Sequence, residues 1–247
     1  MSKKNALVTG GTRGIGRAVS LQLARQGYRV FALYGRNRAA ADDLAAQAAK
    51  ENLPIETLRG DLTRSETLTG ILEEIRQKAP TIDALVHCAA SGVHRPAEEL
   101  TPKHIRWTFD INVFAIHELI AGLIERIPSG GRIVGITSAG GTRVIPYYAA
   151  VGSSKGALEA LFRHYAAEFA PRGISVNCVC PGLVETDAME AFPDKDIRLQ
   201  RVLEGTPTGR ITTVEDVAQV VSFLCSSGAA QIIGQTLVVD GGKTLSS

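Results

Sequence analysis

Short apolar runs rich in Val, Ile and Leu alternate along this chain with longer amphipathic segments, and that order limits the possible folds more than any other feature. Runs such as Leu85–Val86 and Ile133–Val134 show no apolar–polar alternation, so we expect strands that are buried on both faces. Strand–helix repetition with such strands predicts an α/β fold, a doubly wound parallel sheet of about seven strands with helices on both faces. The expected strands are Ala6–Thr9, Arg29–Tyr34, Ile55–Arg59, Ile82–Cys88, Arg132–Ser138, Ile174–Cys180 and Thr236–Asp240. The expected helices are Gly14–Gln26, Ala39–Glu51, Ser65–Ala79, Thr101–Arg126, Tyr147–Ala170 and Val214–Ser226.

Length and composition exclude several classes of protein. The 247 residues suit a single domain spanning 1–247, and the 27 basic and 25 acidic residues leave a net charge of +2, which argues against a nucleic-acid partner. No apolar run approaches the roughly 18 residues of a membrane span, and Met1–Lys4 leads into a strand rather than a signal peptide. We therefore expect a cytoplasmic protein without a membrane partner. The four cysteines show no C-x-x-C spacing and are expected to be reduced core thiols, and no metal site is predicted.

Residues 185–210 form the least patterned region of the chain. They include Pro193, Gly205, Pro207 and Gly209 among charges of both signs. A loop with a short helix of that length inside a compact fold is more often functional than structural, so this region is predicted to be a substrate lid.

A glycine-rich turn, Thr9–Gly16, joins the first expected strand to the first expected helix. Bare backbone in such a turn can contact a pyrophosphate, and the free N–H groups of the following helix point at the phosphates. A glycine trio alone is a weak signal, but its place between the strand and helix of a βαβ unit makes it specific. The turn therefore predicts a Rossmann-type dinucleotide-binding domain.

The end of the second expected strand bears on which dinucleotide binds. An NAD site has a carboxylate there, about 20 residues after the glycines, that holds the ribose 2′-hydroxyl. This chain has no acid between Tyr34 and Asp42. Arg13, Arg36 and Arg38 can instead supply cations for a 2′-phosphate, so we expect NADPH rather than NADH.

Several motifs in one order resemble the short-chain dehydrogenase/reductase family over roughly residues 5–243. The turn Thr9–Gly16 is similar to the family's T-G-x-x-x-G-x-G, and Asn112 resembles the helix Asn that supports its proton relay. His87 and Cys88 stand where the family commonly has Asn-Asn, and we interpret His87 as a strand-end core or cofactor-wall residue. The resemblance also implies an adenine-contacting Asp61 and a nicotinamide-side Pro-Gly and Thr. The implied cofactor contacts are Gly10, Thr12, Arg13, Gly14, Ile15, Gly16, Arg36, Asp61, Leu62, Ala89, Lys155, Pro181, Gly182, Val184 and Thr186.

The catalytic tyrosine of the family is displaced in this chain. Family members usually carry Tyr-x-x-x-Lys after a catalytic Ser, and counting from Ser138 places that tyrosine at position 151, which is valine, although Lys155 is present. On a helix, Tyr148 would lie about 20° off the face of Lys155 and about 10 Å along the axis. Tyr147 would lie roughly 80° off that face and is the weaker candidate. The chain is therefore either a silent relative or a reductase with a relocated tyrosine, Tyr148.

The spacing Tyr-x6-Lys resembles the enoyl-acyl carrier protein reductases of this family, and most of all the FabL-type, NADPH-dependent enzymes. The likeness extends over stretches within 89–96, 143–161, 206–210 and 234–242. It implies reduction of the C2–C3 double bond of an enoyl thioester, in fatty-acid or polyketide synthesis, on an acyl carrier protein or coenzyme A. Tyr148 would stabilise the enolate oxygen, Lys155 would hold the ribose hydroxyls, and Asn112 and Ser138 would assist.

Ser138 keeps a second function open. Many enoyl reductases of the commoner type have a second tyrosine there, ketoreductases have Ser, and FabL-type enzymes also keep Ser. A reductase of 3-oxoacyl thioesters or other ketones is therefore the first alternative, and a catalytically silent NADP-binding module is the second.

The last strand, Thr236–Asp240, resembles the family's oligomer interface and implies a homotetramer. Basic residues that fit either a carrier contact or an ordinary surface are His94, Arg95, Lys103, Arg106, Lys195, Arg198 and Arg201.

Overall fold

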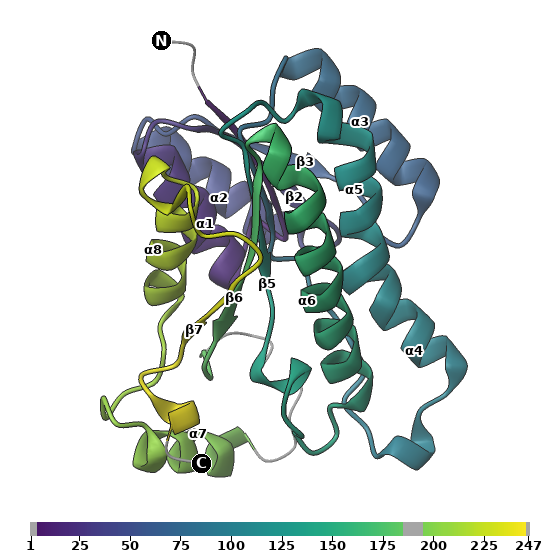
Figure 1. Ribbon diagram of the computed structural model, residues 1–247, viewed down its shortest axis with the longest axis vertical. Helices are drawn as coiled ribbons and strands as arrows, with labels where there is room; N and C mark the ends of the chain where they lie inside the picture. The colour runs from purple at the N-terminus through teal and green to yellow at the C-terminus, as the bar shows by residue number, and fades with distance from the viewer. Residues whose placement is uncertain (1–3, 185–194, 246–247) are drawn as a thin grey trace.

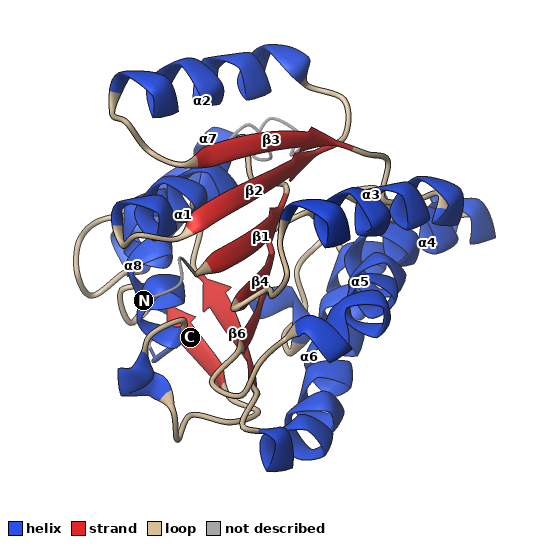
Figure 2. Ribbon diagram, turned by 90° about the horizontal axis from the view of Figure 1, so that it is seen from above, coloured by secondary structure: helices blue, strands red, loops and turns tan. Residues whose placement is uncertain are grey.

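The computed structural model describes residues 4–184 and 195–245, and these form one parallel sheet with helices on both faces (Figure 1, Figure 2). The strands lie in the order β3-β2-β1-β4-β5-β6-β7, and each neighbouring pair is parallel. The predicted α/β fold is confirmed, and the strand bounds differ from the expected ones by one or two residues at most. The strands are β1 (Asn5–Thr9), β2 (Arg29–Tyr34), β3 (Ile55–Arg59), β4 (Ala84–His87), β5 (Arg132–Ile136), β6 (Ser175–Pro181) and β7 (Thr236–Val239).

The helices divide between the two faces of the sheet. Figure 2 shows α1 and α8 on one face and α3, α5 and α6 on the other, and the buried side chains of α2 pack on the same side as α1. The α-helices of the described residues are α1 (Gly14–Arg25), α2 (Arg38–Lys50), α3 (Ser65–Lys78), α4 (Pro102–Phe109), α5 (Ala115–Leu123), α6 (Ala149–Phe169), α7 (Lys195–Gly205) and α8 (Val214–Leu224).

The inner strands are buried on both faces, as their unbroken apolar runs predict. Every residue of β1, β4 and β5 is buried. Leu7 of β1 packs into the core cluster beneath α3, α5 and α6, whereas its neighbour Val8 packs into the cluster beneath α1 and α8. The two edge strands differ: of β3 only Leu58 is buried, and β7, which pairs only with β6 in the described sheet, leaves Val238 53% exposed.

The segment between Thr101 and Arg126, expected to be one helix, is interrupted. A π-helical turn, Asp110–Phe114, separates α4 from α5, and a 3₁₀ turn follows from Ile124 to Arg126. By length and composition alone Pro102–Arg126 could cross a membrane. An 18-residue window of this segment has a mean hydropathy of 1.3, and 44% of that window is buried inside the protein. Buried α5 residues such as Ile116 pack with α3 and α6 in the core, which accounts for the apolar composition.

The helix that carries Lys155 begins later than expected. Tyr147 has a φ of +63°, a left-handed conformation that no right-handed helix continues through, and Tyr148 is the N-cap residue, so α6 starts at Ala149. The prediction of a helix from Tyr147 is therefore wrong for its first two residues. Farther along, a Cβ at Gly135 of β5 would lie 2.7 Å from the ring of Phe162, so this glycine lets α6 pack closely on the sheet.

Candidate active site

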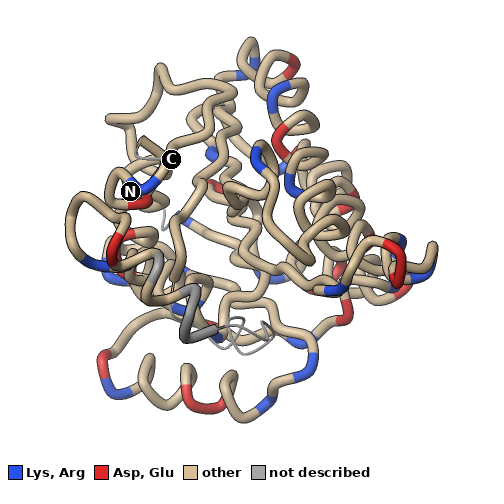
Figure 3. Tube along the Cα trace, turned by 90° about the horizontal axis from the view of Figure 1, so that it is seen from below, with Lys and Arg blue, Asp and Glu red and all other residues tan. Residues whose placement is uncertain are grey.

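A cleft of about 1380 Å³ opens at the carboxyl ends of the strands. It lies where the strand order reverses between β1 and β4, the place where open α/β sheets bind ligands. Figure 3 looks onto this edge of the molecule and shows Lys and Arg positions interspersed with Asp and Glu positions around it. Most of the described residues that line the cleft come from the glycine turn, from the segments that follow β2 to β6, and from the C-terminal turn after β7, and helices contribute the others.

The turn between β1 and α1 leaves its backbone bare, as a bound pyrophosphate requires. Gly10 has a φ of +63°, and a Cβ there would lie 2.9 Å from the Cα and N atoms of Ala89. A Cβ at Gly16 would collide with the carbonyl group of Gly10. Arg13 is an extended N-cap, and α1 has no side-chain cap and no acidic residue in its first turn. This cradle fits a dinucleotide, because the first N–H groups of α1 can bind a phosphate.

Two of the three arginines expected at a 2′-phosphate lie in the cleft. Arg13 and Arg36 line it and are exposed. Arg38 does not line it and instead pairs with Asp42 at 3.6 Å. Arg13 and Arg36 therefore lie where a phosphate at this end would meet them, whereas Arg38 lies outside the cleft lining.

Asp61 follows β3 at the same end of the cleft, and Thr63 holds its carboxylate. Its Oδ1 accepts hydrogen bonds from the backbone N–H of Thr63 at 3.0 Å and from the Thr63 hydroxyl at 2.7 Å. These hydrogen bonds lower the pKa of the Asp61 carboxyl, so it is ionised at neutral pH. Asp61 and Leu62 both line the cleft, as expected of adenosine contacts.

The loop after β4 is fixed from two sides. The Thr9 hydroxyl accepts a hydrogen bond from the N–H of Ala89 at 3.1 Å. The Asn112 side chain accepts a hydrogen bond from the N–H of Ser91 and donates one to the Ser91 carbonyl oxygen, both at 3.0 Å. It also donates to the Ser154 hydroxyl at 2.8 Å. Asn112 is buried and does not line the cleft, so it supports the cleft wall without forming its surface.

His87 belongs to the core and not to the cofactor wall. It is fully buried, its Nδ1 lies 2.8 Å from the Thr9 hydroxyl, and within the described residues its Nε2 has no hydrogen-bond partner. Burial lowers the pKa of His87 to about 3, which keeps the ring neutral. Cys88 does line the cleft, and burial raises the pKa of its thiol to about 12.

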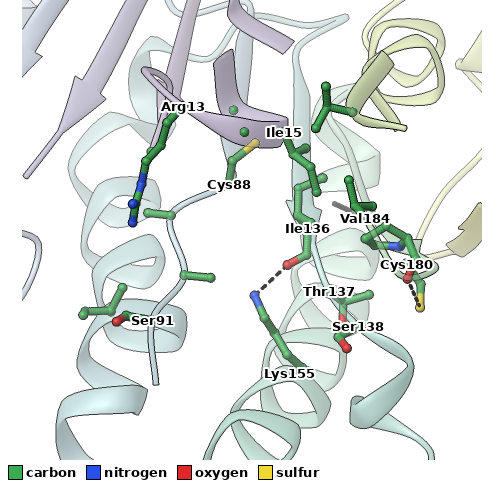
Figure 4. A pocket seen from close by; sticks show the side chains of 18 of the residues that line it. Arg13, Ile15, Cys88, Ser91, Ile136, Thr137, Ser138, Lys155, Cys180 and Val184 are labelled. Carbon is green, nitrogen blue, oxygen red and sulfur yellow. Dashed lines mark hydrogen bonds between the residues drawn. The ribbon is translucent and has the colours of Figure 1, made fainter. Parts of the chain in front are cut away.

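Lys155 is buried where β5 ends (Figure 4). Its Nζ donates a hydrogen bond to the carbonyl oxygen of Ile136 at 2.8 Å, and its exposed fraction is 4%. Burial lowers the pKa of Lys155 to about 8. One turn later on α6, Glu159 accepts a hydrogen bond from the Thr137 hydroxyl at 2.6 Å, which ties this helix to the end of the same strand.

Tyr148 brings a phenol to the cleft wall. Its hydroxyl donates to the Ser138 hydroxyl at 3.4 Å, and burial raises the pKa of the phenol. Tyr147 is 47% exposed and lies outside the cleft lining. Val151 is 5% exposed and also lies outside it, and a Cβ at Gly92 would collide with the Val151 side chain. Position 151 therefore belongs to the core, and the phenol that lines the cleft comes from position 148.

Comparison with known proteins identifies the family. A family model described as enoyl-(acyl carrier protein) reductase matches residues 10–244. The chain is a short-chain dehydrogenase/reductase. It is 35% identical to the 1-cyclohexenylcarbonyl-CoA reductase of Streptomyces collinus over 97% of this chain and 86% of that one, and 32% identical to the acetoacetyl-CoA reductase of Shinella zoogloeoides over 96% and 97%. The solved structure of a Serratia marcescens short-chain dehydrogenase/reductase superimposes with a TM-score of 0.90 at 28% identity, covering 98% of both chains. As in that family, the fold binds a nicotinamide cofactor.

Most of the site residues predicted from the sequence line the cleft of this short-chain dehydrogenase/reductase. Thr186 and residues 185–194 of the expected lid lie outside the described residues, and α7 occupies 195–205 of that region with Val202 in the cleft wall. The predicted residues that line the cleft are Gly10, Thr12, Arg13, Gly14, Ile15, Gly16, Arg36, Asp61, Leu62, Ala89, Ser138, Tyr148, Lys155, Pro181, Gly182 and Val184.

Other cleft residues of this short-chain dehydrogenase/reductase were not predicted from the sequence. Trp107 and Ile111 lie four residues apart at the junction of α4 and the π-helical turn, a spacing that places both on one side of a helix. Arg143 donates a hydrogen bond to the carbonyl oxygen of Thr244 at 2.8 Å, and Lys243 also lines the cleft. The helical pair has a signal in the sequence, whereas the contact across 101 residues between Arg143 and the C-terminal turn has none.

Proposed function

We propose that this protein uses NADPH to reduce the C2–C3 double bond of an enoyl thioester. The observation that carries the proposal is Tyr148, whose phenol lies in the cleft beside Ser138 and seven residues before Lys155, while Val151 is buried. A ketone develops negative charge on the oxygen of the carbon that receives hydride. In an enoyl thioester that charge develops on an oxygen two bonds farther away, and a phenol displaced along the chain suits it.

The residues of the cleft would hold NADPH along its length. The glycine turn would bind the pyrophosphate, Arg13 and Arg36 the 2′-phosphate, and Lys155 the ribose hydroxyls beside the nicotinamide. When bound, the cofactor supplies a hydride to C3 of the substrate. Lys155, with its Nζ held by the Ile136 carbonyl, adds positive charge near the reacting atoms.

Tyr148 would act on the thioester oxygen. Burial raises the pKa of its phenol, so the hydroxyl stays protonated at neutral pH and can donate a hydrogen bond as the enolate forms. In the structure the phenol donates to the Ser138 hydroxyl, and on substrate binding it would donate to the thioester oxygen instead. A proton from water at C2 completes the reduction.

The comparisons support an acyl thioester substrate. The substrate named for the Streptomyces relative, 1-cyclohexenylcarbonyl-CoA, has a ring double bond conjugated with the thioester carbonyl, which is the same class of electrophile. The matching family model is described as an enoyl reductase. These relatives favour a conjugated thioester and leave the length of its acyl chain open.

A reductase of 3-oxoacyl thioesters is the second candidate. The observation that favours it is the Ser138 hydroxyl at 3.4 Å from the Tyr148 phenol, because a hydroxyl pair of this kind can also polarise a ketone oxygen. The similarity to an acetoacetyl-CoA reductase supports this reading. The two candidates use the same cofactor and both receive hydride at C3, but they differ in the oxygen on which negative charge develops, the thioester oxygen in one and the 3-oxo oxygen in the other.

We further propose a phosphorylated carrier for the acyl chain, either coenzyme A or the phosphopantetheine arm of an acyl carrier protein. Arg143 and Lys243 line the cleft and would offset the charge of the carrier's phosphates. The protein would work as a cytoplasmic homotetramer, with the half-exposed edge strand β7 at one interface.

The test is NADPH oxidation with crotonyl-CoA and 2-octenoyl-CoA against acetoacetyl-CoA, using the wild type, Tyr148→Phe and the matched control Tyr147→Phe. We expect enoyl turnover by the wild type, a loss of about 100-fold in kcat for Tyr148→Phe, and wild-type kinetics for the exposed Tyr147→Phe.

Each other result contradicts a specific part of the proposal. Enoyl turnover that survives Tyr148→Phe would refute the mechanism. Turnover of acetoacetyl-CoA alone would establish the ketone candidate. NADPH binding without any turnover would indicate a silent cofactor-binding module.

A further inference from the structure

The ring of Tyr148 contacts two residues, Gly140 and His94, which together form its slot. A Cβ at Gly140 would lie 2.5 Å and 2.6 Å from the Cδ1 and Cε1 atoms of the Tyr148 ring, so the ring rests directly on the glycine backbone. The His94 imidazole lies with its centroid 5.4 Å from that of the phenol, at an interplanar angle of 39°. These walls come from different segments, the 3₁₀ turn after β5 and the loop after β4.

Tyr148 needs such a slot because α6 does not orient its side chain. A helical residue has its side-chain directions limited by the preceding turn, but Tyr148 is the N-cap residue and follows the left-handed Tyr147. Its backbone is held, since its N–H donates to the Ile145 carbonyl at 3.2 Å and its carbonyl accepts from the Gly152 N–H at 2.6 Å. The direction of the ring is then set by what contacts it.

We propose that Gly140 and His94 are positioning residues that hold the Tyr148 phenol at the reacting end of the cleft. The inference rests on the proposed function, in which that phenol binds the thioester oxygen. Gly140 acts by having no side chain, and His94 acts as a flat ring. Neither residue acts through a proton that it gives or takes.

The kinetic test uses Gly140→Ala, His94→Ala and His94→Phe, with Gly70→Ala and His164→Ala as controls, because a Cβ at Gly70 has open space and His164 is exposed. We expect Gly140→Ala to lower kcat for the enoyl thioester about 10- to 100-fold. His94→Ala should lower it about three- to tenfold, and His94→Phe should restore it. KM, the Kd for NADPH by fluorescence titration and the kinetics of both controls should stay within about twofold of the wild type.

A second measurement does not depend on turnover. Ultraviolet difference titration of each variant against the same variant with Tyr148→Phe gives the pKa of the phenol. Burial raises this pKa, so a ring released from its slot into water should show a lower one in Gly140→Ala and His94→Ala, but not in His94→Phe.

The slot is refuted if Gly140→Ala keeps both the wild-type kcat and the wild-type phenol pKa. The proposal is equally refuted if kcat falls as much in His94→Phe as in His94→Ala, because an aromatic ring at position 94 would then not be sufficient to hold the phenol. A wild type with no enoyl turnover would refute the proposed function, and the phenol titration would still decide on the slot.

Discussion

Lys155 holds its ammonium group almost entirely out of water, with an exposed fraction of 4% and one hydrogen bond to the Ile136 carbonyl. Burial lowers its pKa from 10.5 to about 8. Between these two values the unfolded chain binds the proton and the folded protein does not. The free energy of unfolding therefore rises as the pH increases from about 8 to 10.5. Below about pH 8 both states hold the proton, and the buried charge destabilises the folded protein in full.

We expect the wild type to gain about 2 kcal/mol in stability relative to Lys155→Met between about pH 7 and about pH 10. Urea unfolding of both proteins at both pH values measures the difference. A pH dependence shared by the two proteins would show that Lys155 does not titrate in this range.

Arg36 is the second residue whose role can be isolated. It lines the cleft at the end of β2, whereas Arg38 is paired with Asp42 outside the cleft, so Arg38 provides a matched control. We expect Arg36→Gln to lower kcat/KM for NADPH about 10- to 100-fold while NADH is little affected, because a charge-assisted contact to the 2′-phosphate is lost. Arg38→Gln should change neither value. A wild type that prefers NADH would contradict the proposed cofactor.

At the scale of elements, the π-helical turn between α4 and α5 is the feature that the sequence does not reveal. Periodicity predicts one helix over 101–126, and the Asn112 side chain matters only through its three hydrogen bonds to Ser91 and Ser154. Those partners lie 21 and 42 residues away. The turn therefore positions an amide that holds the loop after β4 against the cofactor cleft.

Asn112→Leu should lower stability by about 2 kcal/mol, because the half-buried backbone groups of Ser91 lose their side-chain partner and the buried Ser154 hydroxyl keeps only its bond to the Val151 carbonyl. It should also weaken NADPH binding, since the loop from Cys88 to Ser91 lines the cleft. Asn112→Asp keeps the acceptor for the Ser91 N–H, so its stability and its affinity for NADPH should fall less than those of Asn112→Leu. Chemical denaturation and cofactor titration measure both effects, and a leucine variant as stable as the wild type would contradict the account.

At the scale of the whole molecule, the C-terminal turn closes one wall of the cleft. The Asp240 carboxylate accepts hydrogen bonds from the backbone N–H groups of Gly242 at 2.9 Å and Thr244 at 2.8 Å. The Thr244 carbonyl in turn accepts from Arg143, which lies on the segment between Ser138 and Tyr148. The turn from Asp240 to Thr244 is thereby joined to the segment that carries the phenol.

Asp240→Ala should release this turn. We expect a loss of about 2 kcal/mol in stability and a rise in KM for the enoyl thioester, with the Kd for NADPH little changed. Glu125→Ala is the control, because it removes a carboxylate from an exposed ion pair with Arg172, which contributes little. Equal losses in both variants would contradict a role for the C-terminal turn in the substrate end of the cleft.

The sequence alone determined the α/β fold and the glycine turn, because each depends on local period or on spacing along the chain. Unbroken apolar runs predicted the doubly buried inner strands, and bare glycines predicted the cradle at Gly10. What only the tertiary structure decided is how the phenol is held. Tyr148 lies outside its helix, and its direction comes from Gly140 and His94. The left-handed Tyr147, the π-helical turn and the removal of Arg38 from the cleft likewise depend on contacts that no periodicity encodes.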